Sequence, residues 1–248
     1  PLLAWGVAVG LGLPPVHALG LMLVAAAPGG VTANFVTLMA RGDVALCVTV
    51  TVAGSLAAPL TVPLVVGLAF AALAGDGVSL ALPLGPTIGA VFVTTVVPLI
   101  IGLTIAERRP DRVARVRPVL RRLSFLVFLA IVTTAIVSQW AALVASWREV
   151  GFAALVFDAA AMAIAVLLGR LVGVGRPGLV ALAISGGLRN IALALTVAIG
   201  LLGRPDVAVA ATVYVFTMNA LALAVVGYER RRSGLVADQG RRDGNAVE

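Results

Sequence analysis

Apolar residues run along this chain in long stretches, and short polar or arginine-containing segments separate them. About 18 consecutive apolar residues suffice to cross a bilayer as a helix. Apolar and polar positions do not alternate with a period of two, so the pattern favours helices over strands. The sequence therefore indicates an all-α, polytopic membrane protein, followed after Tyr228 by a polar tail that we expect to be disordered. The helices that we predict, the first of them partial, cover 1–13, 16–40, 44–74, 85–106, 123–147, 150–170, 178–201 and 207–228.

Two of these predicted helices carry helix-breaking residues near their middle. One break is Pro-Gly-Gly at 28–30, the other is Ser-Gly-Gly at 185–187, and an asparagine follows each, at Asn34 and Asn190. Glycine and proline are common in membrane helices, so a single break would carry little weight. Unwound backbone is tolerated in a membrane where it lines a cavity, and paired broken helices mark the binding sites of secondary transporters. The matched pair predicts an inverted-repeat transporter with two crossing discontinuous helices.

Arginine distribution predicts the orientation. The chain is 61% hydrophobic and 12% charged, whereas soluble domains carry about 25% charged residues. A cytoplasmic C-terminus places fifteen arginines inside, leaves only Arg148 and Arg204 outside, and puts Arg189 within the membrane. By the positive-inside rule this predicts a multi-pass protein of the cell (inner) membrane with a cytoplasmic C-terminus. The charges lie in short turns rather than on a folded basic face, so we expect the lipid bilayer and no nucleic acid as a partner.

Several kinds of chemistry are excluded by composition. Cys47 is the only cysteine and His17 the only histidine, so a disulfide framework, a cysteine-based metal site and a multi-histidine site are impossible. An intramembrane hydrolase would need a nucleophile with a base, or a metal, and we predict neither an enzyme nor a cofactor. The chain opens at Pro1 inside an apolar run, without a charged leader region, so we expect its natural N-terminus to be missing.

Two segments carry a family resemblance. The run LMLVAAAPGGVTANFVTLMARGDVALCVTVT resembles the bacterial branch of the bile acid:sodium symporter family, whose pattern here is close to CCPGG-TASN followed by A-[KR]-G-[ND]-VALS. SGGLRNIALALTVA resembles the same family's E-V-G-M-Q-N-S-G-L-A segment. The positions that fit the first pattern are Pro28, Gly29, Gly30, Asn34, Ala40, Arg41, Gly42, Asp43, Val44, Ala45, Leu46 and Thr51.

The resemblance implies a fold of two five-helix inverted repeats, divided into a core domain and a panel domain. It extends over essentially the whole chain and begins inside the third of ten family helices. On this map 1–74 and 150–228 are core, 75–149 holds panel helices with a cytoplasmic arginine-rich loop, and 229–248 is a cytoplasmic tail. The substrates implied are bile-acid-like or other carboxylate-bearing metabolites.

The chain departs from the family pattern where sodium binds. The family's serine before the asparagine is Ala33 here, and the glutamine of the second segment is Arg189. Sodium favours several hard oxygen ligands, so these changes predict at most a weak sodium site and no coupling of the usual family kind. Proton coupling is the alternative. The ion-coupling or remnant sodium residues that we predict are Asn34, Thr51, Cys47 (family serine), Ser185 (family glutamate) and Asp158.

Arg189 is the candidate with the most specific chemistry. A guanidinium at the start of a half-helix is suited to a carboxylate, sulfonate or phosphate. One hypothesis is that Arg189 replaces a bound cation beside an anionic substrate; the other is a structural ion pair with Asp158, the other ionisable residue at membrane depth. A proton on Asp158 would couple transport to the proton gradient. The predicted substrate-binding residues are Asn34, Arg189, Asn190, Asn219 and Gly187.

We therefore predict a secondary-active transporter of a small organic anion that works by alternating access. The alternative is a non-transporting membrane ligand-binding protein or an inactive family remnant, which the lost sodium ligands favour. Uptake separates the two, since only the first moves its ligand.

Overall fold

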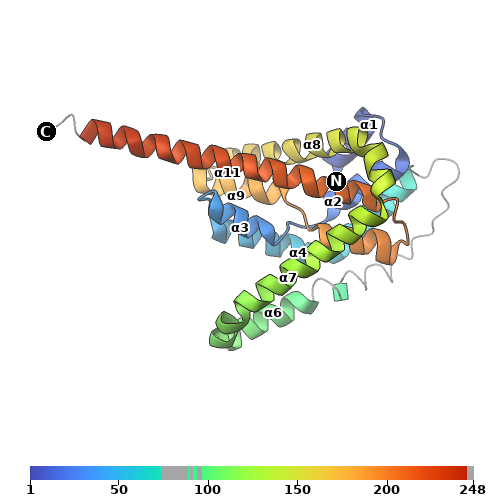
Figure 1. The fold of residues 1–248 in the computed structure, drawn as a ribbon, viewed down its shortest axis with the longest axis horizontal. Coiled ribbons are helices and arrows are strands. Elements are labelled where there is room, and N and C mark those ends of the chain that lie inside the picture. Colours follow the sequence, from blue (N-terminus) through green and yellow to red (C-terminus); the bar gives the residue numbers. More distant parts are fainter. Residues whose placement is uncertain (74–88, 90–91, 94–96, 245–248) are drawn as a thin grey trace.

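The computed structural model describes residues 1–73, 89, 92–93 and 97–244, and these residues form helices joined by short turns (Figure 1). This confirms the all-α prediction. The helices are α1 (Leu2–Gly10), α2 (Pro15–Ala26), α3 (Thr32–Met39), α4 (Val44–Leu73), α6 (Val97–Arg108), α7 (Pro110–Ser138), α8 (Trp140–Leu171), α9 (Arg176–Gly187), α10 (Ile191–Leu195), the π-helix η2 (Thr196–Leu201) and α11 (Ala208–Gly244).

Three of the described helices are long and apolar enough to cross a membrane. They are Val44–Ala69 of α4, Trp140–Leu171 and Ala208–Arg232 of α11. Two shorter apolar helices, Pro15–Ala26 and Ile191–Leu201, belong to the interrupted segments. A span formed by two half-helices is what the sequence predicts at these two places. Of the predicted helix 85–106, residues 85–88, 90–91 and 94–96 lie outside the described residues, and α6 covers 97–106.

Two boundaries predicted between 107 and 150 are wrong. The arginine-rich segment 107–122 is helical apart from a tight turn at Arg109, where Pro110 begins α7. Proline fits the first turn of a helix because its missing N–H has no intrahelical acceptor there. The next boundary lies at Gln139 and not near residue 148, so Arg148 lies within the continuous helix α8.

The prediction of a disordered tail is also wrong for most of its length, because α11 continues to Gly244. No proline follows Pro205 in the sequence, and the segment after Tyr228 is rich in arginine and other good helix formers. The polar composition of this segment predicts disorder, but a helix without a helix-breaking proline can continue from the apolar span into a polar segment.

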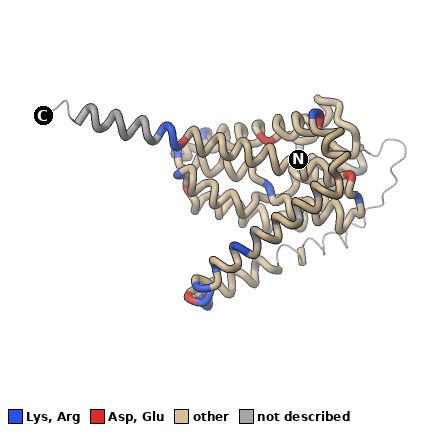
Figure 2. Tube along the Cα trace, in the orientation of Figure 1, with Lys and Arg blue, Asp and Glu red and all other residues tan. Residues whose placement is uncertain are grey.

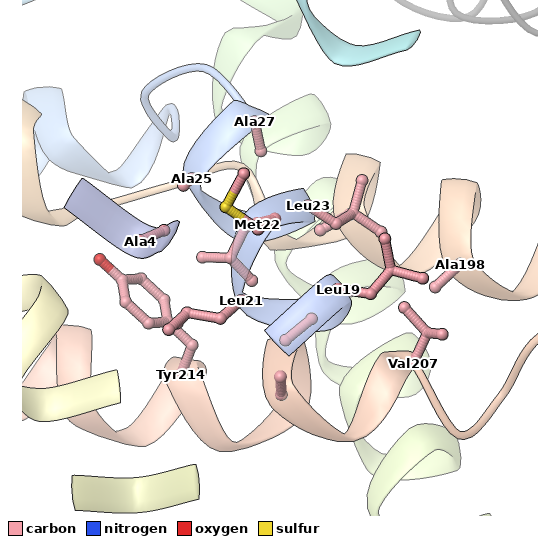
Figure 3. Packing of buried hydrophobic residues seen from close by; sticks show 14 of the residues in the cluster. Ala4, Leu19, Leu21, Met22, Leu23, Ala25, Ala27, Ala198, Val207 and Tyr214 are labelled. Carbon is pink, nitrogen blue, oxygen red and sulfur yellow. The ribbon is translucent and has the colours of Figure 1, made fainter. Parts of the chain in front are cut away.

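The core surrounds α2, whose residues from Ala18 onward are buried. Leu19 and Leu23 of α2 lie against the segment that contains Ala198 and Val207, and Tyr214 reaches the other side of the same helix (Figure 3). A Cβ atom on Gly20 would meet the Val207 carbonyl oxygen. α2 therefore depends on glycine to approach the start of α11.

Charged residues join the helices at one end of the bundle, where basic positions gather (Figure 2). Arg176 at the start of α9 forms an ion pair with Glu229 of α11 at 2.8 Å. Arg230 donates a hydrogen bond to the carbonyl oxygen of Met39 at the end of α3, at 3.2 Å. These contacts link α3, α9 and α11 at the end where their helices carry most arginines.

Candidate functional site

The two interrupted segments cross and bond to each other through their backbones. The Gly30 N–H donates to the Leu188 carbonyl oxygen at 3.0 Å, and the Asn190 N–H donates to the Pro28 carbonyl oxygen at 2.8 Å. Between these bonds Gly29 and Arg189 form an antiparallel bridge. Each segment supplies partners that an unwound backbone lacks, which explains how two helix interruptions can persist in an apolar interior.

The first interruption lies where the sequence predicts it. α2 ends at Ala26 and α3 begins at Thr32. A Cβ atom on Gly30 would lie 2.9 Å from the Arg189 carbonyl oxygen, so a side chain there would force the two backbones apart. Glycine at this position permits the close approach on which the crossing depends.

The second interruption is displaced from the predicted place. Residues 185–187 are the last turn of α9, and the unwound segment is 188–190. Gly186 and Gly187 allow α9 to pack against α8, since a Cβ on Gly187 would lie 2.6 Å from an Asp158 carboxylate oxygen. The glycines serve helix packing here, and the chain unwinds directly after them.

A small polar cluster lies on the α4 side of the crossing. The Cys47 sulfur and the Ser185 hydroxyl are 3.1 Å apart, although 138 residues separate them in sequence. Thr37 donates to the same sulfur at 3.3 Å, and the Thr51 hydroxyl donates to the Cys47 carbonyl oxygen at 2.8 Å. All four residues are buried. Their side chains offer hydroxyl groups and one sulfur, and no carboxylate.

A second polar group lies on the α8 side. Asp158 is fully buried, and its Oδ1 accepts a hydrogen bond from the Tyr214 hydroxyl at 3.1 Å. The same hydroxyl lies 2.7 Å from the Gly187 carbonyl oxygen. Its single proton can therefore be donated to either of the two acceptors. Asp158 Oδ2 has no hydrogen-bond partner in the described part of the chain. Tyr214 therefore connects the buried carboxyl group to the end of α9.

Arg189 lies between the two half-helices and is partly exposed. The described residues contain the ion pairs Arg176–Glu229 and Arg204–Asp206, and neither involves Arg189. The structure thus lacks the Asp158–Arg189 ion pair that was one of the two sequence hypotheses; the Tyr214 hydroxyl instead occupies one carboxylate oxygen. Arg189 is near enough to interact electrostatically with the Asp158 carboxyl group and the Tyr214 hydroxyl group. Its buried Nε has no hydrogen-bond partner among the described residues.

The three predicted asparagines take different places. Asn190 caps α10, because its Oδ1 accepts a hydrogen bond from the Leu193 N–H at 3.1 Å. Asn34 lies in the first turn of α3 with a buried Oδ1 that has no partner in the described residues. Asn219 is exposed on α11, and its amide nitrogen donates to the Val215 carbonyl oxygen at 2.7 Å. Asn34 and Asn190 therefore flank the crossing, whereas the side chain of Asn219 bonds to its own helix.

Sequence reasoning missed Tyr214 and Thr37. A tyrosine in the middle of an apolar span is a usable signal, since a buried hydroxyl nearly always has a partner. Its partners, however, lie 56 and 27 residues away. Thr37 gave a weaker signal, because threonine hydroxyls in membrane helices commonly bond to their own backbone.

Comparison with known proteins extends the resemblance that the crossing motifs carry. Residues 1–146 match the Sodium Bile acid symporter family. The chain is 46% identical over 66 residues to the uncharacterized sodium-dependent transporter YocS of Bacillus subtilis (strain 168), a match that covers 27% of this chain and 21% of YocS.

Two plant proteins match over more of the chain. The probable sodium/metabolite cotransporter BASS1 of Arabidopsis thaliana is 28% identical over 232 residues, which are 93% of this chain and 56% of that protein. Its counterpart from Oryza sativa subsp. japonica is 29% identical over 203 residues, or 80% and 48%. The chain thus spans about half the length of these plant relatives. With the family match covering more than half of its residues, this chain belongs to the sodium bile acid symporter family.

Proposed function

We propose that this chain is part of a secondary-active transporter that carries a small organic anion across the membrane by alternating access. The named relatives are a sodium-dependent transporter and sodium/metabolite cotransporters. The observation that carries the proposal is the position of Arg189, at the crossing of two interrupted helices and without a carboxylate partner in the described residues. A guanidinium within a membrane is costly unless an opposite charge accompanies it, and a substrate carboxylate would supply that charge.

The polar groups around Arg189 fit recognition of an anion. Guanidinium N–H groups match the two oxygens of a carboxylate. Asn190 already caps α10 through its oxygen, which leaves its amide N–H₂ as a donor. Asn34 supplies a further amide at the start of the opposite half-helix. We assign these three residues to the substrate site, and Gly187 supports the site through its backbone. The Asn219 side chain would contact substrate only after releasing its hydrogen bond to the Val215 carbonyl oxygen.

Sodium does not fit the residues of the α4 side. The Cys47 sulfur takes the place of a hydroxyl oxygen, and it is engaged with Ser185 and Thr37. Sulfur is a soft ligand, whereas alkali and alkaline-earth cations prefer oxygen. The carboxyl group of Asp158 lies on the other side of α9, next to Gly187 and Tyr214. We infer that Arg189 supplies the positive charge beside the substrate, and that transport does not use sodium in the usual family manner.

Asp158 is our candidate for the coupling group, with a proton as the coupling ion. It is fully buried, one oxygen accepts from Tyr214 and the other has no partner among the described residues. A protonated carboxyl group would be neutral and would remove a charge from the neighbourhood of Arg189. Proton binding and substrate binding would then influence each other through one short path, Asp158–Tyr214–Gly187–Arg189.

The test is uptake by the full-length protein in vesicles, with a panel of organic acids and with an imposed proton gradient, an imposed sodium gradient or neither. We expect the proton gradient to drive uptake, Arg189→Gln to abolish uptake and substrate binding, and Arg189→Lys to retain part of the binding. Asp158→Asn should keep the Tyr214 hydrogen bond and lose the response to the proton gradient. Uptake that follows sodium and is unchanged in Arg189→Gln would refute the proposal, and binding without uptake would favour the non-transporting alternative.

A further inference from the structure

A hollow of about 600 Å³ lies along the outer surface of the bundle, between α8, α9 and α11. Its lining is apolar except at one end. The small side chains of Ala159, Ala163 and Ala224 make room for the hollow, and Leu167 and Leu221 form its walls. We call this hollow the α8–α11 groove.

On α11 the groove lies on the opposite side of the helix from Asn219. On α11 its lining residues are 221, 224, 225 and 228, which at 3.6 residues per turn centre on the side of the helix roughly opposite Asn219. Ala163 and Leu167 are exposed, and both α8 and α11 are candidate membrane spans. The groove therefore opens towards the hydrocarbon of the bilayer.

The polar end of the groove carries Arg170, in the last turn of α8, and Tyr228. Both side chains are exposed, and neither forms a hydrogen bond or an ion pair with another described residue. Arg176 nearby differs, because Glu229 neutralises it at 2.8 Å. The Arg170 guanidinium and the Tyr228 phenol thus lie at one end of the otherwise apolar α8–α11 groove, where the helices leave the hydrocarbon region.

We propose that the α8–α11 groove binds one anionic phospholipid, with an acyl chain along the alanine-lined hollow and the phosphate at Arg170 and Tyr228. An acyl chain matches the long apolar shape, and the arginine complements the negative head group. A bound lipid would pack against Met162 and Ala183, which line the groove. Met162 also touches the position of Gly187, so the lipid would abut the back of the crossing.

The test uses the full chain in phosphatidylcholine vesicles that contain a trace of phosphatidylglycerol with a photoreactive diazirine on its acyl chain. A phosphatidylcholine probe with the same diazirine serves as the comparison. We expect the phosphatidylglycerol probe to label peptides from 159–167 and 221–225 preferentially. Arg170→Gln should lower that labelling roughly fivefold, which corresponds to about 1 kcal/mol per arginine at an anionic surface.

Matched variants make the result specific. Ala163→Phe fills the groove and should reduce labelling by both probes, whereas Ala142→Phe, at an exposed position elsewhere on α8, should not. Arg148→Gln removes an exposed arginine from the same helix and should also leave labelling unchanged. Equal labelling by the two probes, with no effect of Arg170→Gln, would overturn the proposal. So would protection of these peptides by a second copy of the chain or by another segment of the full-length protein.

Discussion

Tyr214 is the residue on which the α8 side of the site depends. Among the described residues, its hydroxyl is the only hydrogen-bond partner of the Asp158 side chain, and it also contacts the Gly187 carbonyl oxygen. A buried carboxyl group and a buried carbonyl oxygen therefore share one donor. Removal of this hydroxyl leaves the Asp158 carboxylate oxygen and the Gly187 carbonyl oxygen without this donor, although both residues are buried.

Tyr214→Phe should therefore destabilise the folded protein by about 1–3 kcal/mol, the range for a buried polar group that loses its partner. Thermal unfolding of the purified protein in detergent measures this loss. Tyr228→Phe is the matched control, because Tyr228 is 61% exposed and its hydroxyl bonds to no described residue. Equal stability of the two variants would contradict the role assigned to Tyr214.

Among the structural elements, the two half-helix pairs were predictable and their exact junctions were not. Helix-breaking residues in two apolar runs predicted both interruptions, and the first lies at 28–30 as expected. The second follows the Gly-Gly pair, because Gly186 and Gly187 serve the contact between α9 and α8. A sequence shows that glycine permits unwinding, but it does not show whether a neighbouring helix requires the missing side chain.

The candidate site likewise has a part that the sequence predicts and a part that it does not. Arg189, Asn190 and Asn34 were identified from their distance to the breaks, which is a local property of the sequence. The contact between Cys47 and Ser185 and the link from Asp158 to Tyr214 are formed by residues far apart in the chain. Periodicity gives the face of a helix on which a residue lies, whereas the partner of that face is determined by packing.

Gly30→Ala tests the crossing as an element. The new Cβ would lie 2.9 Å from the Arg189 carbonyl oxygen, a backbone atom that cannot rotate away. We expect a loss of about 1–3 kcal/mol in stability, typical of an overpacked site, and weaker binding of the organic acid identified in the uptake panel. Gly6→Ala in α1 is the control, since nothing lies within 4 Å of its Cβ position. Unchanged unfolding of Gly30→Ala would show that the two backbones can separate.

For the whole molecule, the distribution of charge predicts the orientation in the membrane. Basic residues gather at the turn between α6 and α7 and where α11 leaves the bundle, on the same side of the view (Figure 2). The opposite end holds Arg204, whose hydrogen bond and charge lower the pKa of Asp206. The positive-inside rule counts basic residues rather than net charge, so the end with the larger number of arginines should lie in the cytoplasm.

Single cysteines at the two ends test this orientation. In Asp111→Cys the new thiol lies at the turn between α6 and α7, and in Pro205→Cys it lies before α11; both positions are exposed, whereas the native Cys47 is buried. A membrane-impermeant maleimide added to intact cells should label the second variant and spare the first. Permeabilised cells should show labelling of both, and the reverse pattern in intact cells would invert the assigned topology.

The shared backbone bonds at the crossing impose an order on the assembly of the protein. In the described part of the chain, the carbonyl oxygen of Pro28 and the N–H of Gly30 have their partners in residues 188–190, which the ribosome makes much later. The early half of the chain must therefore enter the bilayer with these groups still unsatisfied, or wait at the translocon until its counterpart arrives. Maturation of the binding centre is thus a late event in biosynthesis, and it requires the two halves of one polypeptide to meet.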